Sequence, residues 1–197
     1  MKSWATVLLL AASTGVAQAA EIKTVLAHPP FESTYACMEH WDGQLPELGD
    51  ALGADCTIEK LVEADGRTWA RMYATDGKKN EDWFGWNEPV LSPCDCKVRK
   101  TNENPVVNQP GVLGKPPASF VLLERADGVN FILAHVQAVS VHEGDTVKAG
   151  QAVARVGNNG YARQPHVHLG AWKGNTPLQI RFDQTKMTPK EERKDAR

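Results

Sequence analysis

The sequence predicts an all-β protein built from short antiparallel strands. Gly and Pro are frequent, with 16 Gly and 12 Pro in 197 residues, which favours a fold with many turns. Short apolar runs meet at Asp65-Gly66 and Asp127-Gly128, and Asp-Gly between such runs is a strong hairpin signal. The periodicity of an amphipathic helix is weak throughout the chain.

In chain order, the first part is predicted to be irregular and the next a hairpin. Residues 21–55 are interrupted by Pro and Gly, so we expect a loop-rich lead-in with one short helix near Leu45–Leu52. Residues Cys56–Val62 and Thr68–Tyr73 flank Asp65-Gly66 and are predicted to pair.

The second part of the chain is predicted to carry the remaining strands. Residues 101–119 contain four Pro and two Gly and are expected to form a long surface loop. Phe120–Leu123 and Asn130–Val136 are predicted to form a second hairpin around Asp127-Gly128. Further short strands are expected at Val139–Val141, Thr146–Val147, Ala152–Val156 and Val167–Trp172.

The first nineteen residues have the pattern of a secretory signal peptide. Lys2 is basic, Val7–Ala12 is apolar, and Ala17-Gln18-Ala19 fits a cleavage site. We therefore expect export to the periplasm or medium. No apolar run of the mature chain is long enough to span a bilayer. Lys and Arg number 22 against 24 Asp and Glu, a net charge of −2, which argues against a nucleic-acid-binding surface.

Four cysteines are present, and export favours disulfides. Four cysteines allow three pairings, and the simplest by sequence is Cys37 with Cys56 and Cys94 with Cys96. The alternative for Cys94 and Cys96 is free thiols or zinc ligands, although Cys-x-Cys lacks the spacing of a structural zinc site.

The candidate chemistry lies in three histidines. In a strand, His166 and His168 share one face while Val167 points to the other. Neutral imidazole is a common zinc ligand. His135 ends the apolar run Phe131–Ala134, and a polar ring at that position needs solvent or a partner. The alternative interpretation is two surface histidines on an edge strand.

These histidines belong to a string that resembles the lysostaphin/LytM-type zinc endopeptidases, which cut peptidoglycan cross-links. The string contains His135-Val136 at a strand end, a V-x-x-G-x-x-V-x-x-G-Q run at Val141–Gln151, a G-N-x-G turn at Gly157–Gly160, and a P-H-x-H strand at Pro165–His168. Pro89–Val98 matches an upstream strand pair of the family less closely. The resemblance covers about residues 70–172.

The resemblance implies a LytM-like barrel-sandwich domain and a zinc site. We expect the domain at 65–183, an N-terminal accessory segment at 20–64 and a charged tail at 184–197. The resemblance implies that His168 is a zinc ligand, with His135 and His166 as general base and transition-state stabiliser beside a zinc-bound water. Zinc lowers the pKa of its water, and an adjacent imidazole can accept the released proton.

The remaining two ligands of the family come from an H-x-x-x-D motif that this chain does not show clearly. Asp76 is the best candidate for the carboxylate, but Met72 stands four residues earlier, and a thioether is a poor ligand beside imidazole and carboxylate. Asp76-Gly77 is also a good turn. The open alternatives are neighbouring and upstream polar residues: Asn80, Glu81, Asp82, His28 and His40.

Two functions follow from these observations. The first is an exported zinc endopeptidase acting on peptidoglycan or its stem peptides. The alternative is a catalytically degenerate LytM-like domain that binds peptidoglycan or regulates another cell-wall hydrolase as its partner. A lipoyl- or biotinyl-like carrier is disfavoured because the turn at Gly157–Gly160 has no Lys. Trp83, Phe84 and Trp86 are expected to belong to the core rather than to a substrate groove.

Overall fold

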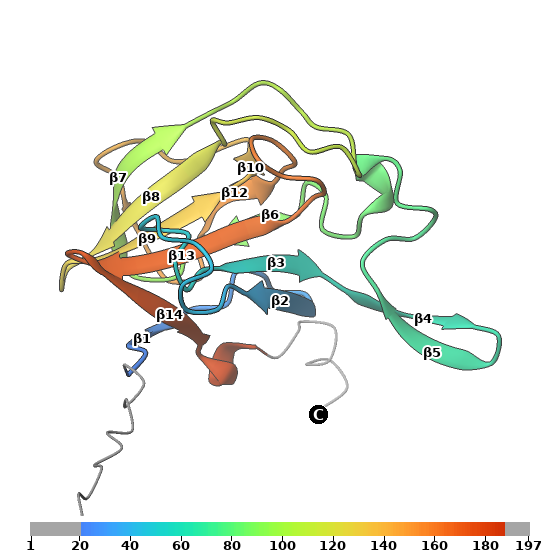
Figure 1. Cartoon of the computed structure of the whole chain (residues 1–197), viewed down its shortest axis with the longest axis horizontal. Coiled ribbons are helices and arrows are strands. Elements are labelled where there is room, and N and C mark those ends of the chain that lie inside the picture. Colours follow the sequence, from blue (N-terminus) through green and yellow to red (C-terminus); the bar gives the residue numbers. More distant parts are fainter. Residues whose placement is uncertain (1–20, 188–197) are drawn as a thin grey trace, which may run out of the picture.

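The protein is built almost entirely from strands, as the sequence predicts. The computed structural model describes residues 21–187 (Figure 1). Two short 3-10 helices, η1 (Asn80–Asp82) and η2 (Gln184–Lys186), accompany the strands. The strands are β1 (Thr24–Ala27), β2 (Tyr35–Glu39), β3 (Ala54–Ile58), β4 (Lys60–Ala64), β5 (Arg67–Arg71), β6 (Pro89–Leu91), β7 (Cys96–Asn102), β8 (Phe120–Arg125), β9 (Val129–Ala134), β10 (Val136–Gln137), β11 (Thr146–Val147), β12 (Ala152–Val156), β13 (Val167–Lys173) and β14 (Thr176–Phe182).

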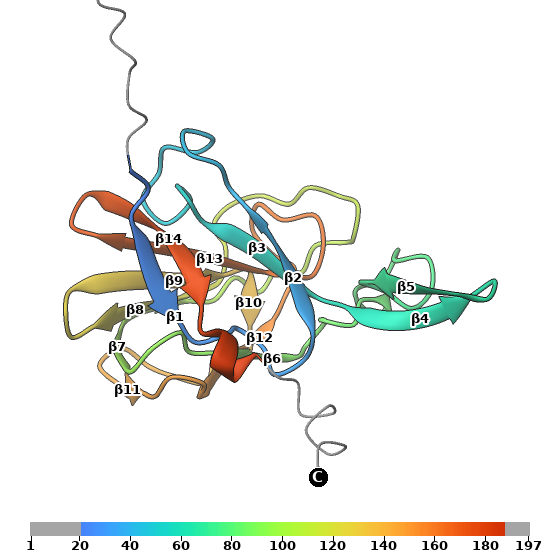
Figure 2. The same cartoon turned by 90° about the horizontal axis from the view of Figure 1, so that it is seen from below.

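A large curled sheet and a small sheet enclose the core. The large sheet has the order β1-β14-β13-β9-β8-β7-β11, and β3 joins it through β13 and carries β2 on its other edge (Figures 1 and 2). The small sheet has the order β10-β12-β6. Alternate residues of both sheets point inward, so Leu123 and Leu133 of the large sheet pack in one cluster with Val90, Val136 and Val153 of the small one.

The first predicted hairpin projects from the body of the molecule as a separate two-stranded sheet, β4–β5 (Figure 2). Its two-residue loop has positive φ at both Asp65 and Gly66, the backbone that Asp-Gly favours in a tight hairpin. The predicted strand Cys56–Val62 is divided, because β3 ends at Ile58 and β4 begins at Lys60. The second hairpin is confirmed as β8–β9, with Gly128 in the left-handed region.

Two predicted elements are wrong. No helix forms near Leu45–Leu52, because positive φ angles at Gly49 and Leu52 break the segment into turns. Val139–Val141 is not a strand, since Ala138 also has a positive φ and the chain bends there. The Val139 amide then donates to the Glu103 carboxylate instead of a neighbouring strand. The predicted long loop is present from residue 103 to 119.

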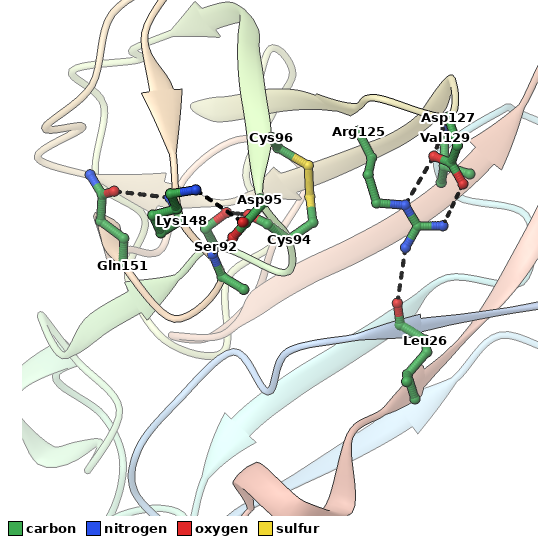
Figure 3. The surroundings of a disulfide bond; sticks show 11 residues. Leu26, Ser92, Cys94, Asp95, Cys96, Arg125, Asp127, Val129, Lys148 and Gln151 are labelled. Carbon is green, nitrogen blue, oxygen red and sulfur yellow. Dashed lines mark hydrogen bonds and ion pairs between the residues drawn. A yellow bond between two sulfur atoms is a disulfide. The ribbon is translucent and has the colours of Figure 1, made fainter.

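Both predicted disulfides are present, Cys37–Cys56 and Cys94–Cys96. Cys37 and Cys56 are directly opposite in the β2–β3 pair, so this bond ties β2 to the sheet. Cys94–Cys96 closes the turn before β7 (Figure 3). Within this turn Asp95 accepts hydrogen bonds from the Ala149 amide and the Lys148 ammonium group.

The N-terminal segment contributes directly to the large sheet. β1 pairs in parallel with β14, and β3 pairs antiparallel with β13. The boundary predicted at residues 64 and 65 falls at the tip of the β4–β5 hairpin. The predicted signal peptide 1–19 and most of the predicted tail 184–197 lie outside the described residues. Within residues 21–187, no helix is long and apolar enough to cross a membrane.

Candidate active site and metal centre

Strand β13 carries His168 through the middle of the large sheet, and His166 comes directly before its first residue. His168 lies opposite Asp55 of β3 on one side and opposite Ala134 of β9 on the other. Val167 and Leu169 point into the core, where they are almost fully buried. The two-residue period of the strand therefore places His166 and His168 together on the opposite face, as the sequence predicts.

His40 reaches the same place from the end of β2. Glu39 pairs with Ala54, and the His40 amide donates to the carbonyl of Gly53. The loop 41–53 then returns the chain to β3. His40 stacks on His168 with ring centroids 5.3 Å apart, so the loop and the β2–β3 pairing together bring a third imidazole beside Asp55.

His40, Asp55 and His168 form a group whose ligand atoms lie within 4.8 Å of one another. Nε2 of His40 is 3.6 Å from Oδ2 of Asp55, and Nδ1 of His168 is 2.8 Å from Oδ1 of Asp55. Two imidazoles and one carboxylate are a common ligand set for catalytic zinc, which keeps a fourth position open for water or substrate.

The ring nitrogens of His40 and His168 that point away from Asp55 are hydrogen-bonded to backbone carbonyls, an arrangement that suits a cation beside Asp55. Nδ1 of His40 donates to the Asp50 carbonyl and Nε2 of His168 donates to the Gly49 carbonyl. A carbonyl only accepts, so these nitrogens carry the protons. In neutral rings the lone pairs would lie on His40 Nε2 and His168 Nδ1, on the side of Asp55. In the charged form of His168, Nδ1 instead donates to the Asp55 carboxylate. Such backbone partners are typical supports of metal-ligating histidines.

His135 and His166 lie beside this group with their rings 4.7 Å apart. Nδ1 of His135 donates to the Asn159 carbonyl and Nδ1 of His166 donates to the Gln164 carbonyl. Each neutral ring therefore has its lone pair on Nε2. His135 follows the last residue of β9 and has a φ of 61°, an uncommon backbone for a non-glycine residue, although histidine adopts it more often than most.

Burial and neighbouring charges set different protonation states within the group. Burial, aided by the nearby His166, lowers the pKa of His135 to about 3, and burial also lowers the pKa of His166. Burial works to lower the pKa of His168, but the hydrogen bond and charge of Asp55 outweigh it and raise that pKa. Burial opposes ionisation of Asp55, but the surrounding histidines overcome it, so its pKa falls. Two neutral imidazoles thus flank a charged pair.

Two cavities meet at these residues. The larger, of about 530 Å³, is lined by all five site residues and by polar groups such as Arg163 and Gln164. The smaller, of about 230 Å³, shares Asp50, His135, Tyr161 and His168 with it. The histidine cluster is therefore accessible to a ligand bound in an open groove.

The structure brings His135, His166 and His168 together but leaves Asp76 apart from them. The exposed Asp76 carboxylate binds the amide and ammonium groups of Lys78, which lower its pKa. Asp76 therefore stabilises this turn, in agreement with the alternative interpretation. Asp55 is the carboxylate that lies beside the histidines. Met72 lines the larger cavity but Asp76 does not.

The tryptophan and phenylalanine residues near this turn take structural positions. Trp83 is buried and donates its indole N–H to the Gly77 carbonyl. Phe84 is partly buried and packs against the core. Neither of them, nor Trp86, lines the two cavities.

Sequence reasoning missed Asp55 and named His40 only as one alternative. An H-x-x-x-D motif that ends at Asp55 needs His at position 51, where this chain has Ala51. The motif therefore lacks its histidine in this sequence. The imidazole beside Asp55 belongs to His40, which lies fifteen positions earlier and is brought close by the loop 41–53.

Comparison with known proteins identifies the family. The family model "Peptidase family M23" matches residues 82–180, about half of the chain. An uncharacterized metalloprotease of Haemophilus influenzae is 32% identical over 80 residues, which are 41% of this chain and 15% of that protein. The chain thus corresponds to less than a sixth of the length of this curated relative.

Solved structures of related proteins align over most of the chain. The catalytic domain of lysostaphin from Staphylococcus simulans is 18% identical, with a TM-score of 0.45 over 73% of this chain and 87% of that one. The M23 metalloprotease pseudoalterin is 14% identical, with a TM-score of 0.46 over 79% and 75%.

This chain belongs to peptidase family M23, a family of metal-dependent peptidases. The predicted resemblance is thereby confirmed. The family match contains His135, His166 and His168 and begins after His40 and Asp55.

Proposed function

We propose that this protein is an exported zinc metalloendopeptidase that cleaves the peptide cross-links of peptidoglycan. His40, Asp55 and His168 would hold the zinc ion, and His135 and His166 would act on the substrate and the attacking water. The family supports the class of reaction. The signal-peptide pattern of residues 1–19 supports export.

The observation that carries the proposal is the convergence of a complete ligand set beside two further imidazoles. Three ligand atoms lie within 4.8 Å of one another, and the His135 and His166 rings adjoin them at the floor of one cavity. A structural zinc site has four protein ligands, whereas three leave a position for chemistry. This arrangement therefore favours catalysis over a purely structural metal.

Each flanking imidazole has a role that its geometry supports. Bound zinc would polarise the scissile carbonyl and lower the pKa of water. His135, neutral and held by the Asn159 carbonyl, presents Nε2 to accept a proton as general base. His166, held by the Gln164 carbonyl with Nε2 3.7 Å from Oδ1 of Asp55, would stabilise the developing oxyanion in its protonated form. The nearby Asp55 charge favours that form, against the effect of burial on the pKa of His166.

The degenerate, non-catalytic alternative loses its main support. That alternative rests on the missing histidine of the H-x-x-x-D motif, and the position of the His40 imidazole beside Asp55 and His168 speaks against it. A binding module has no evident need for four imidazoles gathered around one half-buried carboxylate.

Zinc stoichiometry of the purified mature protein tests the proposal. The wild type should carry about one zinc per chain and lose it on chelation. His40→Ala should reduce zinc binding strongly, whereas the matched control His142→Ala should not, because that side chain is exposed, pairs with Asp145 and lines neither cavity. Mass spectrometry of digested peptidoglycan would then identify the cleaved bond.

The outcomes separate the two functions. Zinc in the wild type together with released cross-link fragments supports a peptidase. A folded wild type that takes up no zinc, or a His40→Ala variant that keeps all of it, contradicts the ligand assignment. In the first case the degenerate, peptidoglycan-binding alternative becomes the better account.

A further inference from the structure

The smaller cavity beside the histidine cluster differs in character from the larger one. Besides the four shared residues, its walls are mainly apolar, formed by Leu48, Pro116, Ala118, Phe120, Ile132 and Ala134. The larger cavity has Arg163, Gln164 and Thr57 among its lining residues. The larger cavity also has apolar lining residues, such as Met38, Leu45 and Leu113, but arginine, glutamine and threonine side chains line it alone.

The floor of this apolar cavity is continuous with the site residues. Ile132 and Ala134 are two apart on β9, and Ala134 pairs with both His168 and Phe120. His135 follows Ala134 directly. A group bound on this floor therefore lies next to His135, the residue proposed as general base.

Part of the wall of this cavity is formed by two loops, 41–53 and 103–119. Leu48 comes from the loop 41–53 that also delivers His40, and Pro116 and Ala118 come from the long loop 103–119. Gly49 lies against Ile132 and Trp172, with an added Cβ at 3.3 Å from each, so the loop is packed closely on the sheet. The wall containing Leu48 is thus fixed relative to the metal group.

We propose that this cavity holds one uncharged aliphatic side chain of the peptide substrate, from the residue on one side of the scissile bond. This inference rests on the proposed peptidase function and adds its specificity. The volume of about 230 Å³ is several times the 30 Å³ that one water occupies, so an alanine to leucine side chain fits. A charged side chain would lose its hydration against the apolar walls, and Asp50, the acidic residue of the lining, already lies 3.4 Å from Nε2 of His168.

Hexapeptides of sequence Gly-Gly-Gly-X-Gly-Gly test this inference, with X as the L or D form of Leu, Asp or Lys, or as Gly. The surrounding glycines leave X as the sole side chain available to the cavity. With zinc-loaded protein, we expect cleavage next to X, with kcat/KM for Leu exceeding that for Gly and Asp by about 10- to 100-fold. Mass spectrometry shows on which side of the bond X lies.

A charge introduced at Leu48 gives the decisive variant. Leu48→Lys should reverse the preference, raising the ratio of Asp to Leu turnover by about tenfold or more, a gain that misfolding does not produce. The matched control is Leu61→Lys, because Leu61 is 75% exposed on the β4–β5 hairpin and lines neither cavity. That variant should keep the wild-type preference.

Binding of the same peptides to zinc-free protein, measured by NMR titration, gives a readout that does not depend on turnover. Tighter binding for X as Leu than for Asp, reversed in Leu48→Lys, supports the inference even where no peptide is cleaved. Cleavage without preference for X, or with a preference that Leu48→Lys leaves unchanged, overturns it while the peptidase function stands. Equal or absent binding of all the peptides, in a protein that cleaves none of them, overturns the inference as well.

Discussion

Asp55 and His168 are directly opposite in the pair of strands β3 and β13, with Oδ1 of Asp55 2.8 Å from Nδ1 of His168. The two residues are 113 positions apart in the sequence. Their pairing places the carboxylate of an N-terminal strand beside the histidines of the C-terminal half. It makes the N-terminal segment part of the candidate site.

His135 and His166 should be separable from the metal ligands by experiment. His135→Ala or His166→Ala should retain zinc, because neither belongs to the three-residue group. Each should lower kcat by about 10²- to 10⁴-fold if the ring transfers a proton or stabilises charge. Zinc content and peptidoglycan turnover, measured on the same samples, test this. A variant that loses both together would place that histidine among the ligands.

The disulfide Cys37–Cys56 should support both stability and metal binding. It closes a loop with a sequence separation of 19, for which chain entropy predicts a stabilisation of about 3 kcal/mol. It also fixes β2, which carries His40 at its end. The double variant Cys37→Ser/Cys56→Ser should therefore lower the unfolding free energy in urea and weaken zinc binding.

The matched control for this disulfide is Cys94→Ser/Cys96→Ser. That bond has a sequence separation of 2, so it constrains the unfolded chain much less. Asp95 lies between these cysteines and holds Ala149 and Lys148, away from the metal group. Zinc affinity unchanged in the first double variant, or reduced equally in both, would contradict the proposed role of β2.

Gly170 should be required for the loop 41–53 to reach the site. A Cβ atom at Gly170 would overlap the Gly49 carbonyl oxygen, which is also the acceptor for Nε2 of His168. Gly170→Ala should therefore displace the loop, destabilise the fold by about 1–3 kcal/mol and weaken zinc binding.

Gly85→Ala provides the comparison for Gly170→Ala. Its added Cβ would meet Ile58 at an ordinary contact of 3.6 Å, and zinc binding should be nearly unchanged. Calorimetric unfolding and zinc titration of both variants test the prediction. Full zinc affinity in Gly170→Ala would show that the loop tolerates displacement.

Tyr35 should make the protein less stable at alkaline pH. Its hydroxyl is buried without a hydrogen-bond partner among the described residues, and burial raises the pKa of the phenol. Above an unfolded pKa of about 10, the unfolded chain releases the proton while the folded chain keeps it. The unfolding free energy therefore falls as pH rises from about 10 toward the raised folded pKa.

The substitution Tyr35→Phe should remove this loss of stability. Because the ring is only partly buried, we expect a benefit of a few tenths of a kcal/mol to about 1 kcal/mol at pH 11. At pH 8 the change should be near neutral, since the hydroxyl makes no hydrogen bond there. Urea unfolding of wild type and variant at both pH values measures the difference. Parallel losses in the two proteins would assign the alkaline effect to other groups.

The sequence by itself determined the local structure and part of the site. Asp-Gly pairs define hairpins through their backbone preference, and the two-residue period of a strand places His166 and His168 on one face. The spacing of residues 135–168 was sufficient to indicate the family. These features depend on neighbours within a few residues or on a continuous motif, so they can be read directly.

The tertiary structure alone decided which residues complete the candidate metal site formed by His40, Asp55 and His168. The partnership of Asp55 with His168 depends on the register between β3 and β13, and the position of His40 depends on the β2–β3 pairing and on turns at Gly49 and Leu52. No local pattern marks Asp55 or His40 as a ligand, because position 51 holds Ala where the family motif has His. Asp76 looks like the carboxylate ligand in the sequence but lies in a turn apart from the histidines. Long-range strand pairing is set by packing of the whole sheet, which is why Asp55 could be recognised as a ligand candidate only in the folded protein.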